Sequence, residues 1–278
     1  MKADLHNHSY YSDGVLSPRE LVSLANEAGC NLFSLTDHDT TGGVAEAQIE
    51  AHKLGIKLIN GVEISAFWRN MTIHIVGLGI DLNNDKLQEG LTHNQKLRKD
   101  RAKKIALGLW RVGIKDALEK TKSLSKTEML TRTHFAQMLI KEGYCKDMKS
   151  VFKRYLTGKK PGGVHVEWKN IEEVVNWIHA AGGKAIIAHP FRYRMTNTKI
   201  KNMLLNFKEV FGDGVEVVTA TSTDEEISLS NQWAEEYGLS SSCGSDYHGW
   251  TNQRIQIGSL RDLPNLDNAI WRYLTCRA

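Results

Sequence analysis

The 278-residue sequence predicts an α/β fold, in which a parallel sheet closes into a barrel that is interrupted by an inserted helical domain. Short apolar runs alternate with capped amphipathic helical segments, as they do in βα units. From about residue 84 to residue 160 this alternation gives way to long helical periodicity rich in Lys and Arg. We therefore expect a barrel built from residues 1–84 and 164–278, with residues 85–163 forming a helical insertion that acts as a substrate lid.

The first part of the barrel carries the clearest βα pattern. A helix is expected to begin after Ser17, because Ser17 can cap it, Pro18 suits its first position and Glu20 completes a capping box. Gly29 is expected to end this helix. The expected helices of this part span residues 18–28 and 44–54, and the expected strands span residues 2–6, 31–36, 57–65 and 72–79.

The second part of the barrel repeats the alternation after a hinge at residues 159–163, which contain one proline and two glycines. Helices are expected at residues 171–181 and 224–237, and strands at residues 184–188, 215–218 and 239–244. The insertion carries six cations among the nine residues from Lys96 to Lys104. This run could follow an RNA backbone, or it could be a solvated helix face.

The composition excludes several kinds of site. The formal net charge of +4 permits a phosphate-bearing substrate without requiring one. The four cysteines, Cys30, Cys145, Cys243 and Cys276, form no C-x-x-C pair, so we expect neither a disulfide framework nor a thiolate zinc site, and a cytoplasmic location fits best. No apolar run is long enough to span a membrane, the N-terminus lacks a signal-like segment, and no obligate protein partner is evident.

Imidazoles and carboxylates recur at or just beyond the ends of the predicted strands. His6 and His8 are two residues apart in an extended segment, so both rings should point to the same side and could bind one metal ion. In α/β barrels the rim at the strand ends is where sites are built. The side chains of this kind are His6, His8, Asp37, His38, Glu63, His189, Asp246 and His248.

The histidines and carboxylates on and after the predicted strands also have structural interpretations. His74 could be a core histidine between isoleucines, Glu63 and Glu216 could cap helices or pair with arginines, and Asp37 and Asp39 could serve turns. Repetition at so many strand ends favours a shared site. Imidazole and carboxylate donors without thiolates suit Mn, Zn or Fe, and neighbouring divalent ions would activate water for phosphoester hydrolysis. The sequence contains neither a G-x-S-x-G elbow, which would indicate a serine nucleophile, nor a Walker loop, which would bind nucleotide phosphates.

These motifs resemble the polymerase and histidinol phosphatase (PHP) superfamily, in the family's order and along nearly the whole chain. The matching segments are His6-x-His8, Asp13, Thr36-Asp37-His38-Asp39, Gly61-Val62-Glu63-Ile64-Ser65, His74, Ala188-His189-Pro190 and Gly244-Ser245-Asp246-Tyr247-His248. The resemblance implies a distorted (β/α)7 barrel around three divalent metal ions. It assigns one ion to His6, His8, Glu63 and Asp246, a second to Glu63, His74 and His189, and a third to Asp13, His38 and His248. Some relatives have histidine in place of Asp13. The aspartate in this chain favours a harder ion, so Mn²⁺ is expected, with Zn²⁺ or Fe²⁺ as alternatives.

Within the superfamily, the insertion and two smaller motifs are most similar to the branch of nucleoside 3′,5′-bisphosphate phosphatases and RNase AM-type 5′-3′ exoribonucleases. The motifs are Thr131-Arg132-Thr133-His134-Phe135-Ala136 and His189-Pro190-Phe191-Arg192-Tyr193. The branch implies a metal-dependent hydrolase that cuts the 3′-phosphoester beside a 5′-phosphate, in pAp-like nucleotides or at 5′-monophosphorylated RNA ends, with metal-activated water. Arg132, His134 and Arg192 would bind substrate, and Asp246, His38 and Glu63 would be catalytic.

Two other functions stay open from the sequence. One is a small-molecule phosphatase, such as one for histidinol phosphate, although an insertion bearing Arg132 is more than a small monophosphate needs. The other is a metal-stabilised RNA-binding module without catalysis, which the complete ligand set disfavours. Arg132 and Arg192 could also form surface ion pairs, and His134 could lie on a helix face. Residues 216–220 depart from the tyrosine-containing version of the branch, so no substrate contact is assigned to them.

Overall fold

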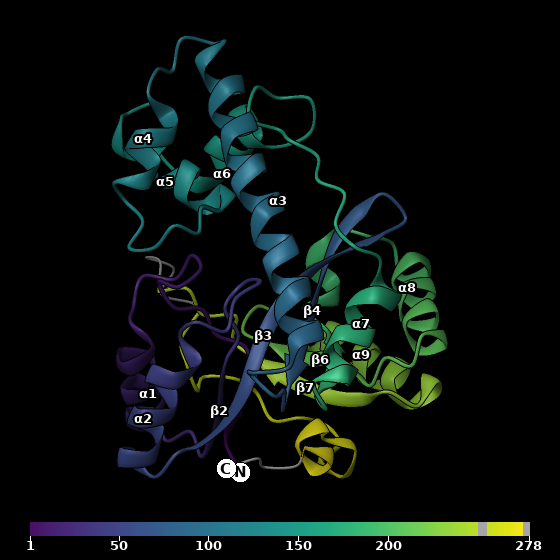
Figure 1. Cartoon of the computed structure of the whole chain (residues 1–278). Coiled ribbons are helices and arrows are strands. Elements are labelled where there is room, and N and C mark those ends of the chain that lie inside the picture. The colour runs from purple at the N-terminus through teal and green to yellow at the C-terminus, as the bar shows by residue number, and fades with distance from the viewer. Residues whose placement is uncertain (250–254, 275–278) are drawn as a thin grey trace.

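The computed structural model describes residues 1–249 and 255–274. The strands and most of the helices lie in the lower part of Figure 1, and the helices α4, α5 and α6 lie above them. Within the described residues the α/β class predicted from the sequence is confirmed. Cys276 lies outside these residues.

The barrel contains seven described strands, which lie side by side in sequence order. They are β1 (Ala3–Asp4), β2 (Leu32–Leu35), β3 (Lys57–Trp68), β4 (Met71–Leu78), β5 (Lys184–Ile187), β6 (Gly214–Thr219) and β7 (Ser240–Gly244). β1, β2 and β3 are parallel, as are β5, β6 and β7, whereas β4 is antiparallel to both of its neighbours. The barrel is nearly closed, because Leu5 N–H donates to the Cys243 carbonyl at 3.1 Å and Asp246 N–H donates to the His6 carbonyl at 2.8 Å.

The prediction of a fully parallel sheet was wrong at β4. β3 and β4 form a hairpin, in which Trp68 pairs with Met71 and only Arg69 and Asn70 lie between the strands. These two turn residues have positive φ angles of 42° and 67°. Two residues can reverse a chain, but they cannot form the crossover that a parallel neighbour requires. The hairpin also moves Glu63 from the predicted strand end to the middle of the 12-residue β3.

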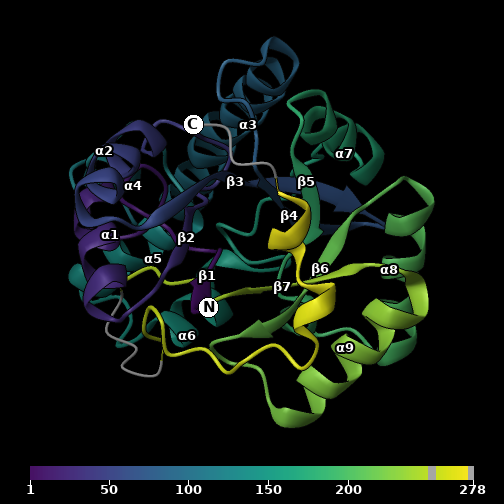
Figure 2. The same ribbon diagram turned by 90° about the horizontal axis from the view of Figure 1, so that it is seen from below.

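Five helices surround the strands on the outside of the barrel, as Figure 2 shows. They are α1 (Pro18–Glu27), α2 (Val44–Leu54), α7 (Ile171–Ala180), α8 (Asn197–Glu209) and α9 (Asp224–Tyr237). The capping box predicted between Ser17 and Glu20 is present. The sequence analysis missed α8, although Thr196 caps it and buried residues from Ile200 to Phe207 repeat at helical spacing.

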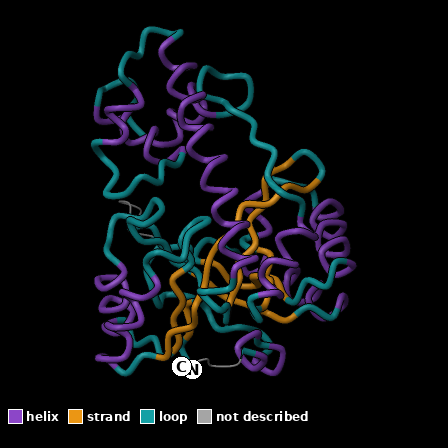
Figure 3. Tube along the Cα trace, in the orientation of Figure 1, coloured by secondary structure: helices purple, strands orange, loops and turns teal. Residues whose placement is uncertain are grey.

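The insertion consists of helices and loops without a strand among its residues (Figure 3). Its elements are α3 (Asp85–Trp110), α4 (Ala117–Lys122), α5 (Arg132–Lys141), α6 (Met148–Val151) and a π-helical turn (Phe152–Leu156). With 26 residues, α3 is roughly 39 Å long, so it can run along the barrel and continue beyond it. Near its start, a Cβ added to Gly90 would come within 2.4 Å of the Trp177 ring. Farther along, Ile105 and Leu109 join Phe135 in a separate apolar core. The lid role of residues 85–163 and the predicted domain boundaries remain predictions.

Two short 3-10 turns, Leu266–Asn268 and Ile270–Tyr273, lie across the end of the barrel in Figure 2. Ile270 is fully buried there. The insertion projects from the other end, where the segments that follow β1, β2, β5 and β7 gather. Among the described residues, no helix is both long enough and apolar enough to cross a membrane.

Candidate metal centre

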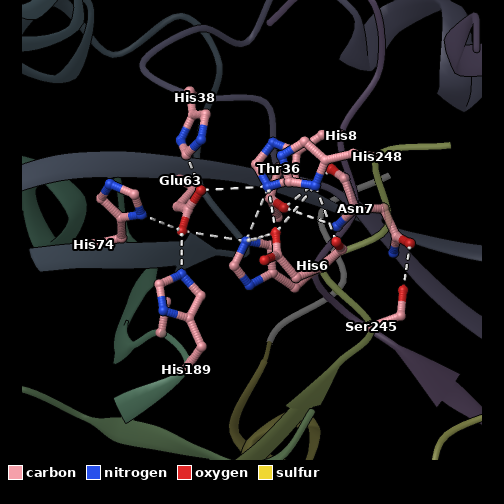
Figure 4. Close-up of polar contacts among 12 residues, drawn as sticks. His6, Asn7, His8, Thr36, His38, Glu63, His74, His189, Ser245 and His248 are labelled. Atoms are coloured by element: carbon pink, nitrogen blue, oxygen red, sulfur yellow. Dashed lines mark hydrogen bonds and ion pairs between the residues drawn. The ribbon is translucent and has the colours of Figure 1, made fainter. Parts of the chain in front are cut away.

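The Glu63 carboxylate lies at the centre of a group of imidazoles (Figure 4). Its side chain is fully buried. Glu63 Oε1 lies 2.9 Å from His74 Nδ1 and 3.1 Å from His189 Nε2, and Oε2 lies 2.7 Å from His38 Nδ1 and 3.3 Å from His8 Nε2. One carboxylate from the middle of β3 therefore joins histidines contributed by four other segments of the chain.

His6 and His8 direct their Nε2 atoms to the same point, 3.1 Å apart, as their spacing predicted. His6 Nε2 also lies 3.3 Å from Glu63 Oε1 and 3.4 Å from Asp246 Oδ1. The interpretation of His74 as a core histidine was wrong, because its side chain is 22% exposed and faces Glu63.

Asp13 anchors the neighbouring part of the centre. Its Oδ1 lies 3.2 Å from His248 Nε2 and 3.8 Å from His38 Nε2. The His8 and His248 rings are stacked with 4.1 Å between their centroids. Asp246 Oδ1 lies 3.0 Å from His8 Nε2 and links this part to the rest.

Four overlapping groups of donor atoms could each hold a metal ion, because the atoms of each group lie within 4.8 Å of one another. The groups are His8, Asp13, His38 and His248; His6, Glu63 and His189; His6, His8 and Asp246; and His38, Glu63 and His74. Together they contain all nine ligands that the family resemblance implied. The donors shared between groups make one continuous centre, and the assignment of individual ions remains a prediction.

The donor set fits divalent metal ions. Six imidazoles and three carboxylates without a thiolate suit Mn, Zn or Fe. Four buried atoms of the centre make no hydrogen bond of regular geometry within the described residues, namely His38 Nδ1, Glu63 Oε2, His74 Nδ1 and His189 Nδ1, although the first three lie within 2.9 Å of a polar atom in the centre. Buried polar atoms normally have hydrogen-bonding partners, so a group of ligand atoms that lacks regular hydrogen bonds and lies around a carboxylate indicates a site for cations.

Burial opposes charge throughout the centre, and the neighbouring groups decide which side chains are charged. Burial and the nearby His248 and His38 lower the pKa of His8 to about 3. Burial also disfavours the charged form of His248, but the Asp13 and Asp246 carboxylates raise the pKa of His248 to about 9. A bound cation would compete with these protons, because imidazole ligands bind metal in the neutral form.

Glu216, for which the sequence analysis considered only a helix cap or an arginine pair, supports two of the histidines. Its Oε1 lies 2.7 Å from His6 Nδ1, and its Oε2 accepts the His189 backbone N–H at 2.7 Å. Against the effect of burial, the Glu216, Glu63 and Asp246 carboxylates raise the pKa of His6 well above its usual value. A hydrogen bond from Nδ1–H to Glu216 leaves the lone pair of His6 on Nε2, which is the atom that faces the centre.

Asp37 holds the loop that carries His8 and Asp13. Its carboxylate accepts hydrogen bonds from Ser9 N–H at 2.8 Å, Ser9 Oγ–H at 2.6 Å and Ser12 Oγ–H at 2.6 Å. Burial raises the pKa of Asp37 to about 7 despite these bonds. The interpretation of Asp37 as a residue that makes turn hydrogen bonds is therefore confirmed, and through these bonds Asp37 holds the loop that carries the ligands.

Backbone geometry at the centre is unusual. Asp39, His189 and Asp246 have positive φ angles of 52°, 30° and 54°. Such conformations cost about 1–3 kcal/mol each in residues other than glycine, and they cluster at functional sites. Gly244 allows the close approach of β7 to the first ligand, because a Cβ added there would lie 2.2 Å from His6 Cβ.

Two arginines that the sequence analysis did not single out face the centre from α3. Arg98 donates from Nε to Asp39 Oδ2 at 2.6 Å and from Nη2 to Ser65 Oγ at 2.8 Å. Arg101 is only 7% exposed, and the described residues provide it with no hydrogen bond or ion pair. The signal for both was present in the basic run, where positions 98 and 101 share one face of a helix.

The three predicted substrate-binding residues come from α5 and from the 3-10 turn Pro190–Tyr193. Arg132 is the first residue of α5, and the described residues give it no ion pair. His134 is buried and accepts the Thr131 backbone N–H on Nδ1 at 3.1 Å. Arg192 pairs with Asp246, whose side chain is buried, so its ion pair lies within the centre and not on the surface. Their roles toward substrate remain predictions.

The sequence pattern of the PHP domain matches residues 4–220. The chain belongs to the PHP family. It is 41% identical over 275 residues to a 3′,5′-nucleoside bisphosphate phosphatase of Chromobacterium violaceum, covering 99% of this chain and 96% of the relative. It is 42% identical over 273 residues to a 5′-3′ exoribonuclease of Haemophilus influenzae, covering 97% and 98%. The PHP resemblance seen in the sequence is thereby confirmed.

A solved structure from Chromobacterium violaceum, described as an amidohydrolase with bound sulfate and no metal, superposes on the chain with a TM-score of 0.93. The two are 41% identical, and the match covers 99% of this chain and 96% of the other. The predicted barrel of the PHP type is confirmed by this similarity. The relatives also confirm the predicted class of activity, phosphoester hydrolysis by a phosphatase or an exoribonuclease.

Proposed function

We propose that the protein hydrolyses the 3′-phosphoester beside a 5′-phosphate, in nucleoside 3′,5′-bisphosphates and at 5′-monophosphorylated RNA ends. The relatives named above include both a bisphosphate phosphatase and a 5′-3′ exoribonuclease. We further propose three divalent ions as cofactors, with Mn²⁺ preferred, and a cytoplasmic location. A substrate with two phosphates needs a second anion site beside the metal centre.

The observation that carries this proposal is the pair Arg101 and Arg132. Together they line a cavity of about 230 Å³ with Trp168. Burial and the neighbouring Arg98 lower the pKa of both guanidinium groups, and the opposing effect of the Asp13 carboxylate does not cancel the shift. The described residues give neither arginine a hydrogen bond or an ion pair. A desolvated cation without a partner is costly, and arginine matches the oxygens of a phosphate with two parallel hydrogen bonds. We assign the 5′-phosphate of the substrate to this cavity.

Divalent ions bound at the centre would supply an activated water and neutralise the oxygens of the scissile phosphate. Glu63 and His38 hold the shape of the centre. Burial disfavours the charged form of Asp246, but Arg192, His248 and His6 lower its pKa and keep it ionised. Asp246 is the proposed acceptor for the proton of the attacking water.

His134 is the proposed donor to the 3′-oxygen as it leaves. Because Nδ1 accepts the Thr131 N–H, the neutral ring carries its proton on Nε2. The products are a free 3′-hydroxyl group and a phosphate, which stays attached to the remaining RNA when the substrate is a polymer.

A substrate panel tests the proposal. Metal-free protein is reloaded with Mn²⁺, Zn²⁺ or Fe²⁺ and given pAp, histidinol phosphate and a 5′-phosphorylated oligoribonucleotide. We expect hydrolysis of pAp and of the oligoribonucleotide, and little from histidinol phosphate, which cannot fill the arginine cavity. Arg101→Met should raise KM for pAp about tenfold or more, since it removes a charge-assisted phosphate contact.

Two results would contradict this assignment. One is a preference for histidinol phosphate over pAp with every metal. The other is full turnover by His38→Ala or Glu63→Ala protein with normal metal content. Lys115→Met, in which an exposed cation of the insertion is removed, serves as the control for Arg101→Met.

A further inference from the structure

The cations of the run from Lys96 to Lys104 do not share one face of α3. Helical residues are about 100° apart around the axis, so Arg98 and Arg101 turn toward the barrel while Lys99 and Lys103 turn to another flank. On that flank Lys99 and Lys103 line a cavity of about 590 Å³. The run therefore contains two sets of cations with different surroundings.

The cavity is an electropositive groove with an apolar floor. Lys122 of α4 and Lys126 of the following loop complete a lining of four lysines, and Leu118 contributes to the floor. Lys103 and Lys122 pair with Asp100 at 3.6 Å and with Glu119 at 3.0 Å, two exposed carboxylates outside this lining. The only carboxylate in the lining itself is Glu128, which pairs with Lys99 at 2.8 Å. Both partners are exposed, 56% for the lysine and 87% for the glutamate, so the pair contributes little and a phosphate group can replace the carboxylate.

The groove continues toward the metal centre. A second cavity of about 230 Å³ shares Lys99, Thr127, Glu128 and Leu130 with the first and extends to Arg98. The Arg98 guanidinium binds the carboxylate of Asp39, the residue that follows His38. Lys126 is held beside this passage, with its ammonium group 4.9 Å from the centre of the Tyr10 ring.

We propose that this groove, from the four lysines to Arg98, binds the RNA chain that continues 3′ of the scissile phosphate. The inference rests on the proposed function, which places the 5′-phosphate against Arg101 and Arg132 on the other flank of α3. The scissile phosphate then lies at the metal centre, and the rest of the strand leaves along the lysines. A pAp-like nucleotide ends at the scissile phosphate and does not reach the groove.

The test compares wild-type protein with the triple variant Lys103→Gln, Lys122→Gln, Lys126→Gln. The matched control replaces Lys57, Lys115 and Lys199, which are exposed and lie outside the groove, by Gln. For each protein, kcat/KM is measured on pAp and on a 5′-phosphorylated octaribonucleotide, and octaribonucleotide binding to the metal-free protein is measured by fluorescence anisotropy at several salt concentrations.

We expect the groove variant to lose about tenfold in kcat/KM on the octaribonucleotide and nothing on pAp, and its log–log salt slope for binding to fall by about 2, roughly 0.7 for each lysine. The control variant should match the wild type, and both variants should melt like it. An equal response of the groove variant on the two substrates, or an unchanged salt slope, would overturn the inference. If wild-type protein hydrolysed neither substrate, the proposed function would fail, and the salt slopes would still decide whether the groove binds RNA.

Discussion

Replacing Glu216 by Gln should weaken metal binding although Glu216 belongs to none of the candidate donor groups. Both carboxylate oxygens are engaged at 2.7 Å, one with His6 Nδ1 and one with the His189 backbone N–H. If the Gln oxygen keeps the bond to His189, the Gln NH₂ group faces His6 Nδ1 and drives the His6 proton to Nε2, where it blocks metal. If the amide is reversed, two N–H donors face each other at His189.

The expected magnitude follows from these two arrangements. An unsatisfied buried donor costs about 1–3 kcal/mol. Loss of the group that orients a histidine ligand lowers metal affinity or activity by about 10- to 100-fold, which corresponds to about 1.4–2.7 kcal/mol. The two estimates agree, so we expect a Kd for Mn²⁺ that rises by at least about tenfold.

Isothermal titration of the metal-free protein with Mn²⁺ measures this effect, with kcat/KM on pAp as the second readout. Asp213→Asn is the matched control, because the Asp213 carboxylate is also a hydrogen-bonded acceptor, for His179, Lys184 and the Ala185 N–H, but lies outside the centre. The control should lose stability and keep its metal affinity. If Glu216→Gln protein bound Mn²⁺ as tightly as the wild type while melting like the control, the orienting role of Glu216 would be refuted.

Three further changes test the supports of the centre. Gly244→Ala places a Cβ 2.2 Å from His6 Cβ, so it should lower the free energy of unfolding by about 1–3 kcal/mol and displace His6. Urea denaturation and the metal content per chain measure these two effects, and wild-type values in both assays would contradict the prediction. Asp39→Asn leaves the Arg98 guanidinium buried and uncompensated, which should cost about 3–5 kcal/mol in chemical denaturation; a loss below about 1 kcal/mol would mean that the pair is replaceable. Chelation should abolish hydrolysis of pAp and lower Tm, and Mn²⁺ should restore both; activity that survived complete metal removal would contradict the metal-dependent mechanism.

Much of the centre could be predicted from local sequence. The i, i+2 spacing of His6 and His8 fixes the side to which both rings point, whatever the rest of the fold does. The capping box at Ser17 likewise depends on residues three apart, and it forms as predicted. Such features involve only near neighbours, so the sequence determines them.

Other features depended on residues that are distant in the chain. The sequence suggested that Glu63 ends a strand, but the hairpin with β4 extends β3 past it and brings His74 to face it. The role of Glu216 likewise depends on contacts with residues 210 and 27 positions away. Hydrogen bonds between residues so far apart in the chain leave no periodic pattern in the sequence, so sequence analysis cannot find them.

The basic run of α3 shows the same division between sequence and tertiary structure. The sequence determined that six cations would stand on one helix. Only the packing of α3 against the barrel decided that Arg98 and Arg101 are buried beside the centre while Lys99 and Lys103 remain in solvent. The physical reason is that a side chain becomes buried only when another element packs against it. A helix therefore has an inner and an outer face only once it is packed.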